Sequence, residues 1–147
     1  MRVANRNSTR NCILAALCLL TVSARTQERL ATGPRVLEVV ADHDSRFKIP
    51  GQRTPVMNLK PGEEIRLRIT AIKAKNENRD GSVHGFALLR AKDKAPVPGW
   101  DLLLQPGTQE FTLTAPAEPG EYEAVCTVIC SSNHELMSLK VVVSSKD

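Results

Sequence analysis

Apolar and polar residues alternate in several short stretches of the chain. The clearest stretch is Ile65–Lys73, where apolar residues occupy the odd-numbered positions up to Ala71 and mostly polar residues stand between them. A period of two is typical of a β-strand with one buried face, because successive side chains point to opposite sides of a sheet. We therefore predict a strand at Ile65–Lys73 whose odd-numbered face lies against a core.

Other short stretches carry similar strand signals, and a Pro-Gly pair precedes several of them. The predicted strands are Val36–Ala41, Pro55–Leu59, Ile65–Lys73, His84–Leu89, Glu110–Thr114, Tyr122–Cys126 and Leu139–Val143. No stretch has the 3.6-residue period of a long amphipathic helix. Short strands separated by turn residues favour an all-β domain, and a Greek-key β-sandwich of about seven or eight strands is the simplest architecture for them.

Two segments between the predicted strands have a different composition. Asn76–Ser82 and Ala91–Gly99 are rich in charged residues, glycine and proline. This composition is typical of solvated loops, because these residues favour turns and do not fill a core. The sequence shows no internal repeat and no sign of a second folded domain.

The first 24 residues stand apart from the rest of the chain. They contain three arginines and no acidic residue, then the apolar run Cys12–Val22, then two small residues. This order is typical of a secretory signal peptide, and the run is about half of the roughly 20 residues that a membrane-spanning helix needs. We predict a signal peptide at 1–24, a spacer at 25–35 and a β domain at 36–147. The protein is then periplasmic or secreted, or tethered to a membrane if the segment stays uncleaved.

The charge of the chain changes once the predicted signal peptide is removed. The whole sequence has 20 Lys and Arg against 16 Asp and Glu, whereas residues 25–147 have 17 against 16. Aromatic residues make up only 3% of the chain. A nearly neutral domain with few aromatic side chains lacks the basic surface and the stacking platforms of nucleic-acid-binding proteins. We therefore expect no nucleic-acid partner.

The candidate chemistry lies in one short segment and one distant histidine. Two of the four cysteines belong to the predicted signal peptide, so the domain keeps Cys126 and Cys130, which are followed by His134 and Met137 and preceded by His84. Thiolates, imidazoles and a thioether form a soft ligand set that suits copper. An exported cysteine pair that stays reduced is also consistent with a bound metal, because free thiols oxidise outside the cytoplasm.

Three other interpretations of these residues stay open. Cys126 and Cys130 could form a disulfide, although residues four apart in an extended strand are too distant and the chain would have to bend. Cys126, Cys130, His134 and Met137 also fit one face of a helix. Two cysteines and two histidines could instead bind zinc, a site in which Met137 has no purpose.

The order of these residues resembles a known copper centre. The segment from Gly120 through Cys126 and Cys130 to Met137, with Val83-His84-Gly85-Phe86 upstream, is similar to the copper A site of cytochrome c oxidase subunit II and of nitrous oxide reductase. The similarity covers roughly Val36–Val143 and implies a cupredoxin fold. It departs from the family pattern where Ser131 stands in place of a common glycine.

The resemblance implies a role for each residue of the motif. Cys126 and Cys130 would bridge two copper ions, and His84 and His134 would each bind one of them. Met137 would be a weak axial ligand of one copper, and the backbone carbonyl group of Val128 would serve the other. Because this last contact is made by the main chain, a valine side chain removes no ligand atom.

The resemblance also implies an activity. We expect an exported protein that carries electrons to or from a cytochrome or another redox protein and is not an enzyme on its own. A further possibility is the electron-accepting subunit of a terminal oxidase, tethered by its N-terminal segment. The alternative from another functional class is a copper carrier or assembly factor that delivers copper to a respiratory oxidase.

Overall fold

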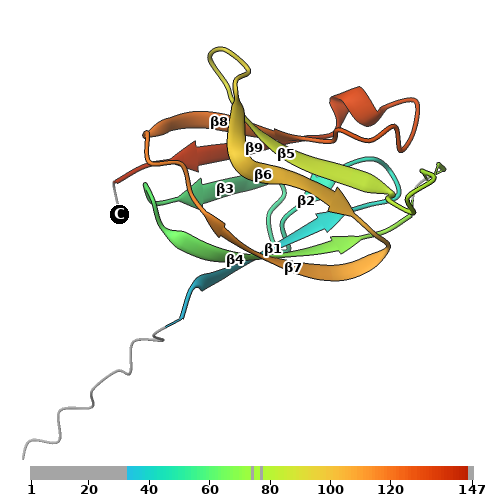
Figure 1. Ribbon diagram of the computed structural model, residues 1–147, viewed down its shortest axis with the longest axis horizontal. Coiled ribbons are helices and arrows are strands. Elements are labelled where there is room, and N and C mark those ends of the chain that lie inside the picture. Colours follow the sequence, from blue (N-terminus) through green and yellow to red (C-terminus); the bar gives the residue numbers. More distant parts are fainter. Residues whose placement is uncertain (1–32, 74, 77, 146–147) are drawn as a thin grey trace, which may run out of the picture. The chain divides into compact units, whose positions relative to one another are not determined.

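A computed structural model describes residues 33–73, 75, 76 and 78–145 (Figure 1). In this part of the chain the elements are β1 (Arg35–Ala41), β2 (Phe47–Lys48), β3 (Val56–Leu59), β4 (Glu64–Ala71), β5 (His84–Arg90), β6 (Pro96–Leu104), β7 (Gly107–Thr114), β8 (Gly120–Val125), the 3-10 helix η1 (His134–Leu136) and β9 (Ser138–Val143). Among these elements no helix is long and apolar enough to cross a membrane. The predicted signal peptide and most of the predicted spacer lie outside the described residues.

The strands form two sheets. One has four strands in the order β2-β1-β4-β7, and the other has five in the order β3-β9-β8-β5-β6. The pairs β1/β4 and β3/β9 are parallel and join strands that are distant in sequence, while the other pairs are antiparallel. The chain therefore crosses between sheets instead of forming a simple meander, as a Greek-key sandwich requires. The predicted all-β sandwich is confirmed, with nine described strands in place of seven or eight.

The hydrophobic core lies between the two sheets. Ile65, Leu67 and Ile69 of β4 are fully buried, so the alternating pattern predicted the inward face correctly. Strand β4 ends at Ala71, two residues before the predicted end, and Ile72 is 44% exposed. The alternation therefore identified the strand and its face, while the end of the strand depends on its pairing with β1 and β7.

Aromatic side chains connect the two sheets. The indole Nε1–H of Trp100 in β6 donates a hydrogen bond of 2.8 Å to the carbonyl oxygen of Thr114 in β7. The rings of Phe47 in β2 and Phe86 in β5 meet edge to face, with centroids 5.1 Å apart. Each pair joins one residue from each sheet, and Phe47, Phe86 and Trp100 are all buried in the core between the sheets.

Strand β6 corrects the sequence prediction. We predicted a solvated loop at Ala91–Gly99, but Pro96–Gly99 belong to this strand. Proline is tolerated here because β6 is an edge strand that pairs only with β5, so no second neighbour needs the missing N–H. The register between β5 and β6 shifts between Ala87 and Leu89, so the pairing of the two strands is irregular there. The two-residue β2 is the other strand that the pattern did not reveal.

The loop between β8 and β9 lies at one end of the sandwich. The N–H of Cys126 donates to the carbonyl oxygen of Met137 at 3.1 Å, which closes the loop at its base. Strand β5 begins at the same end, because Ala87 pairs with Val125 and so places His84 beside the end of β8. Figure 1 shows this loop with η1 at the right-hand end of the view.

Candidate metal centre

His84, Cys126 and Cys130 come together at this end of the sandwich. One ligand atom from each residue, a ring nitrogen or a sulfur, lies within 4.8 Å of the others, and all three side chains are buried. His84 is the first residue of β5, whereas the cysteines follow β8 in the loop. The antiparallel pairing of these two strands thus brings distant parts of the sequence into one cluster of nitrogen and sulfur donors.

The two cysteine sulfurs are 3.8 Å apart, and both residues are free thiols. A thiolate binds a metal ion at about 2.3 Å, and two such bonds at a tetrahedral angle place their sulfurs about 3.8 Å apart. The observed separation therefore fits two thiolates that share a metal ion. The helical interpretation of this segment is wrong, because Cys126 and Cys130 lie outside η1 and on an irregular loop.

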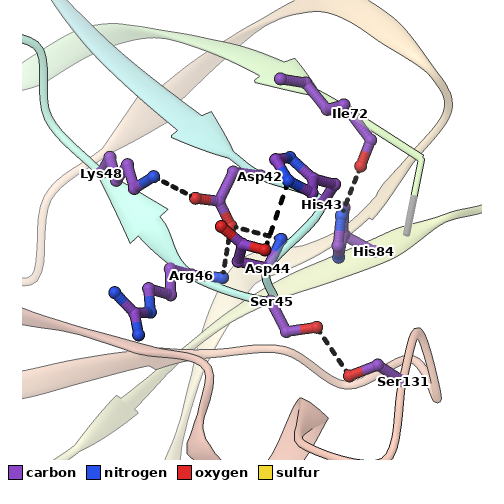
Figure 2. Close-up of polar contacts among 9 residues, drawn as sticks. All are labelled: Asp42, His43, Asp44, Ser45, Arg46, Lys48, Ile72, His84 and Ser131. Carbon is purple, nitrogen blue, oxygen red and sulfur yellow. Dashed lines mark hydrogen bonds and ion pairs between the residues drawn. The ribbon is translucent and has the colours of Figure 1, made fainter. Parts of the chain in front are cut away.

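A backbone carbonyl group holds the ring of His84. Its Nε2 lies 2.9 Å from the carbonyl oxygen of Ile72 (Figure 2), and a carbonyl oxygen only accepts hydrogen bonds. We therefore assign the proton to Nε2, which leaves a lone pair on Nδ1, a buried atom without a hydrogen-bond partner. Burial lowers the pKa of His84, although the carbonyl oxygen of Ile72 and the charge of Asp42 oppose this shift. The ring is thus neutral at neutral pH, as a metal ligand must be.

Cys126 lies among backbone polar groups. Its sulfur accepts a hydrogen bond from the N–H of Gly85 at 3.4 Å and lies 3.3 Å from the carbonyl oxygen of Val128. Burial raises the pKa of the Cys126 thiol and the neighbouring Cys130 raises it further, while the N–H of Gly85 acts in the opposite direction. The thiol of the metal-free protein is therefore protonated at neutral pH, and metal binding has to release that proton.

Gly85 has a function in this geometry that sequence reasoning did not identify. A Cβ atom at this position would lie 2.2 Å from Oγ1 of Thr127 and 2.9 Å from its backbone nitrogen. Glycine alone lets β5 approach the segment after β8 this closely, and the approach brings the Gly85 N–H to the sulfur of Cys126. The only signal in the sequence was a glycine directly after His84.

Two further predicted ligands lie in the same loop. The carbonyl oxygen of Val128 accepts a hydrogen bond of 2.7 Å from the N–H of Cys130, and it also lies next to the sulfur of Cys126. Met137 is 1% exposed and directly precedes β9. A backbone oxygen therefore lies beside the sulfur of Cys126, and Met137 is buried at the base of the loop.

His134 lies outside the cluster of three. Its side chain is half-buried, and its Nδ1 lies 3.1 Å from the carbonyl oxygen of Ser131. Ile129 and Leu136, which belong to the same loop, are 64% and 81% exposed. The loop therefore presents one imidazole ring and two apolar side chains toward solvent.

A contact to the sulfurs also comes from a distant turn. Oγ of Ser45, between β1 and β2, lies 3.7 Å from Sγ of Cys130 and 2.7 Å from Oγ of Ser131. Ser45 precedes Cys130 by 85 residues. No motif links the two positions in the sequence, so sequence reasoning missed this contact.

Several solved structures share this fold. Auracyanin A, a "blue" copper protein from Chloroflexus aurantiacus, matches with a TM-score of 0.52 and 22% identity over 76% of this chain and 100% of its own. Auracyanin B matches with a TM-score of 0.50 and 22% identity over 78% of this chain and 93% of its own. A chain of a heme-copper terminal oxidase dimer matches with a TM-score of 0.50 and 16% identity over 78% of this chain and 68% of its own.

The likeness is one of fold. No family model matches the chain, and no curated protein matches it in sequence. The described residues have the cupredoxin fold that the sequence motif implied, with a buried His-Cys-Cys cluster at one end of the sandwich.

Proposed function

We propose that this protein is an exported electron-transfer protein that binds copper through His84, Cys126 and Cys130. The observation that supports this most directly is the unpaired, buried Nδ1 of His84 beside two free thiols. A buried polar atom without a partner requires an explanation, and a bound ion provides one. Imidazole and thiolate are donors that suit copper, which supplies one-electron chemistry when bound. The fold shared with auracyanin A, a copper protein, agrees with this choice of metal.

We further propose that the centre is dinuclear, like the copper A sites that the motif resembles. In this arrangement both ions would be held by the thiolates of Cys126 and Cys130. Each ion would also have one histidine and one weak ligand, the four groups being His84, His134, the carbonyl oxygen of Val128 and the thioether of Met137. The separation of the sulfurs and the position of the Val128 carbonyl support this assignment. The ring of His134 would have to turn away from Ser131 before its Nδ1 could bind metal.

The scaffold suits electron transfer. His84 begins one strand of the five-stranded sheet, and hydrogen bonds close the base of the cysteine loop between two others, so the donors are held by rigid elements. We propose that a redox partner such as a cytochrome docks at this loop, which carries His134 and the exposed side chains of Ile129 and Leu136. Because this contact is apolar and the predicted mature domain is almost neutral, docking should depend little on long-range charge.

Copper counting combined with electron paramagnetic resonance tests the proposal. The loaded protein should hold two copper ions per chain and give a spectrum in which both ions share one unpaired electron. His84→Ala should lose this signal. His43→Ala is the matched control, because the side chain of His43 is 65% exposed and should not affect copper binding. Failure to bind copper, or a preference for zinc, would contradict the proposed function, whereas one tightly held copper would contradict only the dinuclear centre.

One observation favours a second candidate function, a copper carrier. His134 lies outside the cluster of three, which leaves one imidazole and two thiols, a donor set suited to a single cuprous ion. A carrier must release its metal, whereas an electron-transfer protein retains it in both redox states. Competition with a cuprous chelator separates the two: loss of a single ion to the chelator favours the carrier, and retention favours electron transfer.

A further inference from the structure

A buried carboxylate builds the turn between β1 and β2. Oδ1 of Asp42 accepts hydrogen bonds from the backbone N–H groups of Asp44 and Arg46, at 3.0 and 2.9 Å. Its other carboxylate oxygen forms an ion pair with the ammonium group of Lys48 (Figure 2). Asp42 is 3% exposed, so its carboxylate lies in the interior, where its hydrogen bonds to two backbone N–H groups hold the path of the turn.

Ser45 occupies an unusual backbone conformation within this turn. Its φ is 59°, in the left-handed region that residues other than glycine rarely adopt, and the residue is 4% exposed. Such a conformation persists only where the surrounding structure enforces it, and it is common at functional sites. Here it places the hydroxyl group of Ser45 beside the cysteine loop, next to Ser131 (Figure 2).

The hydroxyl groups form a chain that ends at a sulfur. The N–H of Asn133 donates to Oγ of Ser131 at 3.0 Å, which leaves the proton of Ser131 free to donate to Oγ of Ser45 at 2.7 Å. The proton of Ser45 is then available to Sγ of Cys130 at 3.7 Å. Since a thiolate has no proton to donate, this is the direction that satisfies every member of the chain when the sulfur is ionised.

The two sulfurs therefore have different kinds of hydrogen-bond donor. Cys126 accepts from the backbone N–H of Gly85, whereas Cys130, once ionised, accepts from the side chain of Ser45. We propose that Ser45 is a positioning residue for the copper centre, and that its hydrogen bond to Cys130 raises the reduction potential of that centre. This inference rests on the proposed function. It follows because the reduced centre carries one more negative charge, so a donor to the sulfur stabilises the reduced state more than the oxidised state.

The test compares copper-loaded Ser45→Ala and Ser45→Gly with the wild type and with Ser132→Ala. Ser132 is an exposed serine in the same loop and serves as the matched control. Both Ser45 variants should retain the copper content of the wild type and show a lower potential. The reduced-to-oxidised ratio at a fixed ambient potential should fall several-fold, a tenfold fall corresponding to 59 mV for a one-electron couple. Glycine adopts the left-handed conformation without strain, whereas alanine does not. A fall in potential that both variants share therefore comes from the lost hydroxyl group.

The possible outcomes separate this inference from the proposed function. An unchanged potential in a Ser45 variant that binds copper normally would overturn the role of Ser45 and leave the copper site intact. An equal fall in Ser132→Ala would also overturn it, because the effect would then belong to the loop in general. A wild type that binds no copper would overturn both proposals. Ser131→Ala, which removes the second hydroxyl group of the chain, should give a smaller fall because Ser45 keeps its own proton.

Discussion

Gly85→Ala should disturb both the stability of the domain and its metal centre. The new Cβ would lie 2.2 Å from Oγ1 of Thr127 and 2.9 Å from its backbone nitrogen, so one of the two segments has to move by roughly 1 Å to restore normal contact. Overpacking of this kind costs about 1–3 kcal/mol, and we expect the upper end because a backbone atom is involved. At about 4 °C per kcal/mol for a domain of this size, the melting temperature should fall by about 12 °C.

Thermal unfolding of the metal-free protein and copper titration measure the two effects of Gly85→Ala. Copper affinity should also fall, because the shift withdraws the Gly85 N–H from the sulfur of Cys126. Gly33→Ala is a matched control, since a Cβ at Gly33 meets no atom within 4 Å. Adding Thr127→Ala should restore part of the stability by removing the side-chain clash while the backbone contact remains. A Gly85→Ala variant with the stability and copper affinity of the wild type would refute the close-approach argument.

Three other predictions test separate parts of the structure. Burial by itself would raise the pKa of Asp42, but the ammonium group of Lys48 and two backbone N–H groups outweigh it and hold the pKa below its ordinary value. The ionised carboxylate therefore stabilises the folded state. Its contribution is complete above the unfolded-state pKa of about 3.9 and is lost as the pH falls through the folded-state pKa. In urea unfolding at decreasing pH, the wild type should lose free energy of unfolding more steeply than Asp42→Asn, and parallel curves would contradict this. Cys130→Ser should abolish the dinuclear spectrum, whereas Met137→Leu should retain two copper ions with a shifted potential; a native spectrum in the serine variant would exclude the bridging role. Leu136→Ser should slow electron transfer from a cytochrome several-fold, because it removes an exposed apolar side chain from the proposed docking site. The rate of the wild type should depend little on ionic strength, and a rate that falls steeply with added salt would contradict apolar docking.

The pattern of the sequence was sufficient for much of the scaffold. Alternation identified β4 and its buried face, because a period of two is a local property of an extended chain. It failed at Pro96–Gly99, which belong to β6 and not to the predicted loop. Prolines interrupt a strand pattern, and they are tolerated in β6 only because that strand lies at the edge of its sheet. Edge position depends on the order of all the strands, which no local pattern contains.

The candidate donors were also visible in the sequence. The soft character of Cys126, Cys130 and His84 is a property of their side chains, and the spacing of the cysteines with His134 and Met137 was enough to suggest copper. The structure then showed that His84 and both cysteines share one buried cluster, while His134 lies outside it. That difference depends on the conformation of the loop and could not be read from spacing.

The groups that hold the donors were decided by tertiary structure alone. The carbonyl oxygen of Ile72 orients His84, the N–H of Gly85 reaches one sulfur, and the hydroxyl group of Ser45 reaches the other. Two of these groups belong to the backbone, so side-chain identity does not reveal them. All three act across space, between segments that become neighbours only when the sheets form and pack. The sequence by itself therefore determined which atoms can bind a metal, and the packed sandwich determined how those atoms are oriented and hydrogen-bonded.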